Sequence, residues 1–147
     1  MADVQPKFAV ERLYIRDVSF ETPEEAMPSN QGWQPKLHLD LNVHPKPLEN
    51  NRHEVTLMLT VSVKVDDKQV FIIELQQSGI FRCEGFNGKQ MEEIIHVHCP
   101  AVLFPYARET IDSLVVKGGF PPLMLSPVNF EHLYRQAKSK QSAAQTH

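Results

Sequence analysis

The chain has 147 residues, a formal net charge of −3 and a hydrophobic content of 41%. This length suits a single domain, and the apolar content excludes a wholly disordered chain. The lack of excess positive charge argues against a nucleic-acid-binding protein. No apolar run reaches the roughly 18 residues that a membrane-spanning helix needs.

Two further features of the sequence point to the cytoplasm. The first residues, MADVQPKFAVERLY, lack the basic segment followed by an apolar run that marks a secretory signal. The two cysteines, Cys83 and Cys99, are too few for a disulfide framework. We therefore expect a protein of the reducing cytoplasmic compartment.

The first strand is predicted at residues 8–21, which are rich in aromatic and β-branched side chains. The apolar residues change parity near residues 11–12 and change back near residues 16–17, which predicts two β-bulges. Residues 21–35 contain several prolines and the only tryptophan, Trp33, and predict an irregular segment.

Three more strands follow, at residues 37–43, 55–65 and 70–81. The first two alternate between apolar and polar residues, which indicates strands with one buried face. The last is apolar on both parities around residues 71–73, so we expect both of its faces to be covered there. Residues 66–68 predict a short hairpin turn.

A long helix is predicted at residues 87–117, just before a Gly-Gly pair. Asn87 and Gln90 have the spacing of a capping box. Pro100 and Pro105 lie inside the helical pattern, so we expect one kinked helix or two helices in line. The helix is unusually apolar for so small a domain, and we expect part of its face to pack against another copy of the chain.

The second, shorter helix is predicted to begin with Ser126 as its cap and Pro127 at its first position. We expect flexible ends at residues 1–7 and 138–147. Four strands followed by two helices predict a single α+β domain. In it, a four-stranded antiparallel sheet carries one long and one shorter helix packed on one face.

Five long motifs stand out along the chain. They are RDVSFE (16–21), WQPKL (33–37), IELQQSGIF (73–81), CPAVLFPYARE (99–109) and GGFPPLMLSPVNFEHLY (118–134). With this order and spacing the chain resembles the SecB family of bacterial protein-export chaperones over residues 8–135. The resemblance implies the same sheet and helices, and a homotetramer built as a dimer of dimers with the long helices between dimers. It also implies no catalytic activity and no cofactor.

The resemblance implies two kinds of partner, unfolded precursor proteins and the translocation ATPase SecA, which receives them. The SecA-facing positions carried over by the motifs are Asp17, Glu21, Ile72 and Glu74. Asp17 and Glu21 share one strand parity and could form a single acidic edge. The alternative is that they are ordinary solvated charges. Family tails are often acidic, whereas residues 136–147 here contain no Asp or Glu.

A set of apolar residues in or beside irregular segments could form a groove for unfolded chains. These residues are Met27, Trp33, Leu123, Met124, Leu125, Leu133 and Tyr134. Unfolded proteins share no sequence, so their receptor needs adaptable apolar walls, which Met and aromatic side chains supply. The alternative role for the set is plain core filling.

A third set is predicted to contact other copies of the chain. It consists of Phe71, Ile73, Leu75, Ile94, Ile95, His98 and Val102. The prediction depends on the excess apolar surface of the long helix and of the two-sided strand segment, which one small sheet and two helices should leave partly uncovered.

The run His96, His98 and Cys99 is the best argument for an enzyme, because all three side chains are possible zinc ligands. Residues two apart on a helix do not face each other, and no second ligand pair follows at metal spacing. We therefore expect no metal, and expect these residues to be buried on a helix face. Three hypotheses stay open: a general export chaperone, a SecB-like chaperone dedicated to one client such as an antitoxin, and a small metal-dependent enzyme. For the chaperones we expect no nucleic-acid partner and no stable membrane insertion.

Overall fold

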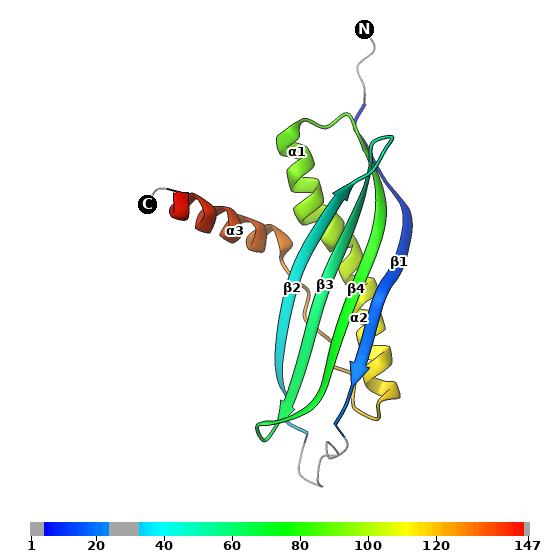
Figure 1. Cartoon of the computed structure of the whole chain (residues 1–147), viewed down its shortest axis with the longest axis vertical. Coiled ribbons are helices and arrows are strands. Elements are labelled where there is room, and N and C mark those ends of the chain that lie inside the picture. The colour runs from blue at the N-terminus through cyan, green and yellow to red at the C-terminus, as the bar shows by residue number, and fades with distance from the viewer. Residues whose placement is uncertain (1–4, 24–32, 146–147) are drawn as a thin grey trace.

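The computed structural model describes residues 5–23 and 33–145, with side chains described as far as residue 140. Its centre is a four-stranded antiparallel sheet in the order β1-β4-β3-β2. The strands are β1 (Lys7–Glu21), β2 (Lys36–Pro47), β3 (Arg52–Val65) and β4 (Lys68–Glu84). A long helix crosses one face of this sheet, and the other face is open (Figure 1). The predicted α+β fold is confirmed.

The strand β1 contains both predicted bulges. Its pairing with β4 shifts register between Val10 and Arg12 and again between Ile15 and Asp17. Each bulge adds one unpaired residue, so the apolar side chains before and after it stay on the helix side of the sheet although their parity changes.

The strand β2 runs further than predicted, through Pro45 and on to Pro47. A proline has no N–H for the sheet, but β2 is an edge strand and needs to bond on one side alone. At the β3–β4 turn Asp66 and Asp67 have φ values of 53° and 63°. Two left-handed residues suit a tight hairpin, and aspartate tolerates that conformation.

The long helix consists of α1 (Gly88–Glu93), the π-helical turn η1 (Ile94–His98) and α2 (Cys99–Lys117). The capping box at Asn87 and Gln90 is present, with hydrogen bonds of 2.8 and 3.0 Å. The widened turn η1 lies directly before Pro100, which has no N–H to donate and whose ring crowds the preceding turn. The predicted irregularity is therefore one wide turn, and α2 continues through Pro105.

The core lies between α2 and the two central strands. Its fully buried side chains include Val55, Leu57, Leu59, Val61, Val63, Phe71, Ile73, Leu75, Leu103, Ile111 and Val115. A Cβ on Gly79 would lie 2.9 Å from the Phe81 ring and 3.1 Å from Leu103, so the missing side chain allows this close packing of helix on sheet.

This core corrects part of the predicted contact between chains. Phe71, Ile73 and Leu75 are at most 1% exposed within a single chain, and β4 bonds to a strand on both sides. No part of them is left for a direct contact with a partner. The helix α2 and the segment that follows it cover the apolar side of this strand, where the sequence predicted a contact with another copy of the chain.

The helix α3 (Phe130–Gln145) begins three residues later than predicted. Its cap is Asn129, whose side chain accepts the N–H of His132 at 3.0 Å, and not Ser126. Its first residue, Phe130, packs edge-on against Phe104 of α2 with ring centres 6.0 Å apart. The helix then projects away from the sheet (Figure 1). Its backbone stays helical through residues 138–145, where the sequence predicts a flexible tail.

Candidate functional site

An aromatic cluster joins four segments at the end of the sheet where β1 stops. We use this name for Phe20, Trp33, Phe71 and Phe120. Ring centres lie 5.6 Å apart for Phe20 and Phe71, 5.0 Å for Phe71 and Phe120, and 5.7 Å for Trp33 and Phe120. Phe71 and Phe120 are buried, whereas Trp33 is half-buried. Trp33 therefore has one side on the core and one side toward solvent.

The position of Phe120 is set by the end of α2. The Phe120 N–H donates to the Val115 carbonyl at 3.1 Å, which turns the chain back onto the helix end. A Cβ on Gly118 would come within 2.4 Å of the Phe20 ring, so the ring packs against bare backbone. The chain then runs back from the end of α2 to the start of α3 (Figure 1).

This returning segment is attached to α2 by Asp112. The carboxylate accepts the backbone N–H of Leu123 at 2.9 Å and that of Met124 at 3.2 Å. Leu123 is half-buried and Leu125 is 5% exposed, so both side chains turn toward the protein. Met124 has a left-handed backbone, with φ of 52°, and its side chain is 74% exposed.

The predicted groove residues thus occupy two places. Leu123 to Leu125 lie on the segment that leaves α2, and Trp33, just before β2, contacts Phe120 of this segment. Leu133 and Tyr134 lie on α3, where the Tyr134 ring stacks on His96 of η1 at 5.3 Å. Met27 is outside the described residues. Phe20, Phe120 and Asp112 were not among the predicted site residues, because their roles depend on contacts between segments far apart in the chain.

The open face of the sheet brings the predicted SecA-facing residues together. The β1–β4 register places Ser19 opposite Glu74, Glu21 opposite Ile72, and Asp17 opposite Gln76. Directly paired residues point to the same side, and this side is opposite to the core. The three acids are exposed.

A further acid lies on the same side. The register continues from Glu74 to Thr60 of β3 and from Thr60 to Asp40 of β2. Asp40 was missed because its place depends on the pairing of three strands. We call Asp17, Glu21, Asp40 and Glu74 the acidic row.

Beyond the acidic row, the open face carries charges that neutralise one another. Arg16 Nη2 lies 2.7 Å from Glu54 Oε2, and the Tyr14 hydroxyl also donates to this carboxylate. The guanidinium of Arg12 lies over the Tyr14 ring, 4.7 Å from its centre. The hydrogen bond from Tyr14, followed by the one from Arg16, lowers the pKa of Glu54.

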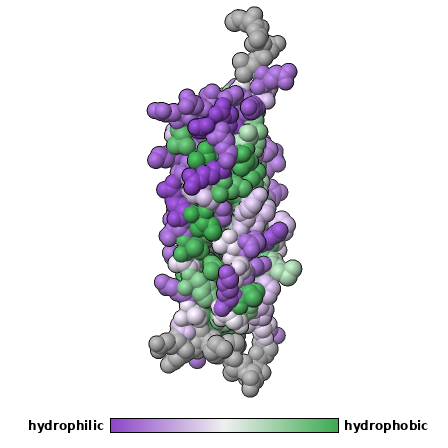
Figure 2. Space-filling model, turned by 90° about the vertical axis from the view of Figure 1, so that its right-hand side faces the viewer, coloured by the Kyte–Doolittle hydropathy of each residue, from purple (hydrophilic) through white to green (hydrophobic). Residues whose placement is uncertain are grey.

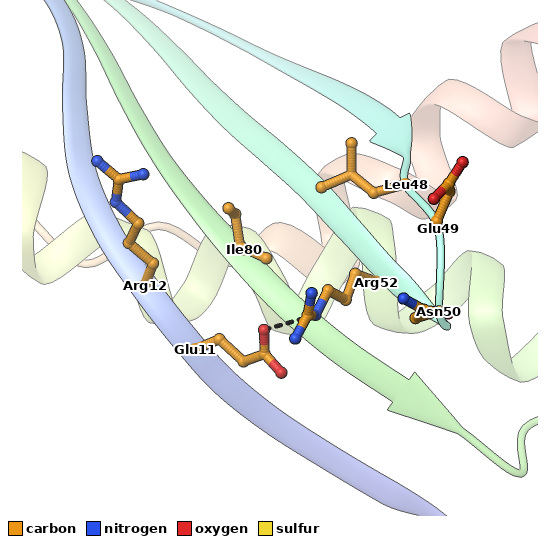
Figure 3. Close-up of a pocket in the computed structure, with 7 residues that line it drawn as sticks. All are labelled: Glu11, Arg12, Leu48, Glu49, Asn50, Arg52 and Ile80. Atoms are coloured by element: carbon orange, nitrogen blue, oxygen red, sulfur yellow. Dashed lines mark ion pairs between the residues drawn. The ribbon is translucent and has the colours of Figure 1, made fainter.

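A polar hollow lies near the β2–β3 turn on this face, lined by Glu11, Arg12, Leu48, Glu49, Asn50, Arg52 and Ile80 (Figure 3). Glu11 pairs with Arg52 at 2.8 Å and with Arg82 at 2.9 Å. The hydrogen bond from Arg82 lowers the pKa of Glu11. Glu11 and the two arginines in and beside the hollow therefore neutralise one another.

The histidine and cysteine run, His96, His98 and Cys99, is spread over the wide turn η1 and the start of α2. Among the described residues, no three His, Cys, Asp or Glu side chains are grouped to hold a metal ion. Cys99 is buried, and burial raises the pKa of its thiol. His96 is half-buried, but His98 is exposed, which corrects the prediction that all three are buried. In the wide turn the Cys99 N–H bonds to Ile94, five residues back, so the side chains no longer follow α-helical spacing.

An apolar edge runs along β1. Phe8, Val10, Ile15 and Val18 are each 38–45% exposed. Hydrophobic surface forms a band along this side of the molecule (Figure 2). Beside it, an apolar hollow is lined by Phe8, Phe86, Ile94, His98, Ala101 and Val102. The hollow brings together three of the residues predicted to contact another chain; the fourth helix residue of that set, Ile95, is half-buried.

Comparison with known proteins gives a consistent match. The family model described as "Preprotein translocase subunit SecB" matches residues 1–141. Proteins named "Protein-export protein SecB" are similar over most of the chain. The one from Marinobacter nauticus is 47% identical over 141 residues, covering 95% of this chain and 86% of its own. The one from Hahella chejuensis is 46% identical over 144 residues, covering 98% and 91%.

A solved structure shares the fold. It is a SecB-like chaperone from Mycobacterium tuberculosis in complex with a peptide from the HigA1 antitoxin. The TM-score is 0.66 at 16% identity, and the match covers 82% of this chain and 90% of that one.

Within the described residues, no helix is long and apolar enough to cross a membrane.

Proposed function

The chain belongs to the SecB family of protein-export chaperones, and from this premise we propose that it binds unfolded precursor proteins in the cytoplasm. It keeps these clients competent for translocation and delivers them to the translocation ATPase SecA. The proposed action is binding alone, without a catalytic step or a cofactor. The observation that carries the client-binding part is Met124, whose side chain is 74% exposed on a segment that Asp112 attaches to α2. The half-buried Trp33 contacts Phe120 earlier on the same segment.

This region suits a client that has no single sequence. Unfolded chains expose apolar and aromatic side chains in varied order, and a flexible thioether adapts to many shapes. Trp33 adds a flat apolar wall that is backed by Phe120. Leu133 on α3 is exposed as well. Several weak apolar contacts along one extended client add up when the client spans more than one site.

General export is favoured over a single dedicated client. The solved SecB-like chaperone binds an antitoxin peptide, but a likeness at 16% identity supports the fold alone. The relatives that share 46% and 47% of their residues are named as export proteins. We therefore propose general export as the activity.

The apolar edge and the adjoining hollow support the proposed homotetramer. Phe8 and Val10 are large apolar side chains left partly exposed on β1, an edge strand. His98 and Val102 lie across the hollow on the long helix. A face that combines an edge strand with a helix flank suits an isologous contact between two chains, and two such pairs would form the dimer of dimers.

The acidic row supports the proposed SecA contact. Asp17, Glu21 and Glu74 are exposed on the open face, with Ile72 half-buried between them. A flat acidic surface around one apolar residue suits a basic partner surface. Its charges would set the association rate and orientation more than the affinity.

The test is light scattering of the pure protein, alone and with a chemically unfolded precursor that lacks tryptophan. We expect the mass of four chains, and a larger complex when the unfolded precursor is added. The emission of Trp33, the only tryptophan, should change with the same stoichiometry. The folded form of the precursor should do neither. Binding of folded and unfolded forms alike, or of neither, would refute the chaperone function.

A further inference from the structure

The Asp112 carboxylate, in the next-to-last turn of α2, makes an unusual contact for an acidic side chain on a helix. It accepts two successive backbone N–H groups, those of Leu123 and Met124, at 2.9 and 3.2 Å. Hydrogen bonds to a charged acceptor are stronger than those to a neutral one. The preceding residues, Pro121 and Pro122, have no N–H, so Leu123 and Met124 supply the first donors after Phe120.

The contact coincides with a backbone conformation that methionine rarely adopts. Met124 has φ of 52°, in the left-handed region that favours glycine. Such a conformation persists where the surroundings determine it, and it is concentrated at binding sites. Here the surroundings are the Asp112 carboxylate on one side and the buried side chain of Leu125 on the other.

The consequence is a reversal of side-chain direction at one residue. Leu123 and Leu125 turn inward, whereas the side chain of Met124 is 74% exposed. An apolar residue held outward by a strained, hydrogen-bonded turn is unlike an ordinary surface methionine, because relaxation of the turn would change where it points.

We propose that Asp112 is a positioning residue of the client site. It holds the left-handed turn and thereby presents Met124 to an apolar or aromatic side chain of an extended, unfolded polypeptide. This inference rests on the proposed chaperone function. Asp112 itself does not touch the client, and its effect on binding is exerted through Met124.

A double-mutant cycle tests this coupling. The variants are Asp112→Ala, Met124→Ala and both together, and the measurement is the dissociation constant for an unfolded client without tryptophan. We expect each single variant to weaken binding about tenfold and the double variant to be no weaker than either one, because both remove the same contact. The matched control is Glu109→Ala, which removes an exposed negative charge from the same helix and should bind within about twofold of wild type.

Hydrogen exchange on the wild type gives a second measurement that does not depend on a variant folding. The Leu123 and Met124 amides should exchange markedly more slowly than the amides of an unstructured chain. Asp112→Asn, which keeps one acceptor oxygen, should speed their exchange and weaken binding less than Asp112→Ala. Mass and circular dichroism must stay unchanged in each variant that is compared.

The outcomes separate this inference from the proposed function. If the wild type binds no unfolded client, the proposed function fails. If the wild type binds but Asp112→Ala binds equally well, or the two single effects simply add, the positioning role is refuted while the chaperone function stands. If Asp112→Ala does not fold, unprotected Leu123 and Met124 amides in the wild type refute the role, and protected amides with weaker binding in Asp112→Asn support it.

Discussion

Replacement of Phe120 by alanine should loosen the aromatic cluster and destabilise the whole domain. Phe120 is 5% exposed and contacts both Phe71 and Trp33. Truncation of a buried phenylalanine costs about 3–5 kcal/mol, which includes the cavity that it leaves. Each aromatic pair contributes about 0.5–1.5 kcal/mol of this beyond the area buried. Typical domains have a free energy of unfolding of about 5–15 kcal/mol, so the loss is a large fraction.

Urea unfolding followed by circular dichroism measures this loss, at one fixed concentration because assembly adds to apparent stability. The emission of Trp33 in the folded variant should also shift toward that of an exposed tryptophan. Phe120→Leu, which keeps most of the volume, should cost no more than about 1.5 kcal/mol. Tyr106→Ala, at a residue that is 51% exposed on α2, should cost about 0.5 kcal/mol or less. A loss below about 1 kcal/mol for Phe120→Ala, with unchanged Trp33 emission, would show that the cluster is not packed as described.

Three more changes test the core, the acidic row and the open face. Ile73→Asp buries an unpaired charge at a residue that is 0% exposed and should prevent folding, whereas Ile72→Asp on the opposite face should leave the protein folded in circular dichroism. Glu74→Lys should weaken SecA binding roughly hundredfold in a titration, while Glu49→Lys at the far turn should not, and wild-type binding should weaken as salt rises. Glu54 has a lowered pKa in the folded state, so the stability it contributes is present above its ordinary value of about 4.5 and is lost as the pH falls below it. Acid unfolding curves should therefore show a shallower loss of stability for Glu54→Gln than for wild type; an equal slope would contradict the assigned hydrogen bonds.

The sheet was predictable because the signals that define it are local. The side-chain period of a strand is two residues, so a change of parity in the sequence reports a bulge directly. Both bulges of β1 lie where the parity changes. The boundaries were harder. Pro45 and Pro47 end a strand in sequence terms but are tolerated in β2 because it is an edge strand, and edge position is a property of the assembled sheet.

The start of α3 shows how two local signals compete. Ser126 followed by Pro127 is a good helix start, and so is Asn129. The chain uses Asn129, and the following Phe130 then packs against Phe104 of α2. Tertiary packing of one aromatic ring is worth more than the difference between two caps, and nothing in the sequence near residue 126 reports that contact.

In the candidate site, too, residues placed by local sequence were predictable, and residues placed by contacts between distant segments were not. Asp17 and Glu21 could be assigned to one face because they lie on one strand, but Asp40 joins them through the register of three pairings. Phe71 and Ile73 were assigned to a contact between chains because two-sided apolar strands need two covers. In the structure the covers on their side are α2 and the returning segment, which brings Phe120 onto Phe71.

The returning segment is held in place by hydrogen bonds to Asp112, which no sequence pattern predicts. Asp112 lies 11 residues before Leu123, and a carboxylate on the polar side of a helix is ordinarily a solvated charge. Only after the chain has turned back past Phe120 do the Leu123 and Met124 amides come within its reach. The residues proposed to contact a client can thus be chosen from their chemistry, because apolar and flexible side chains suit unfolded chains. The residue proposed to position them, Asp112, cannot be chosen in this way. Its chemistry is that of any surface acid, and the proposed role depends on the path of the chain.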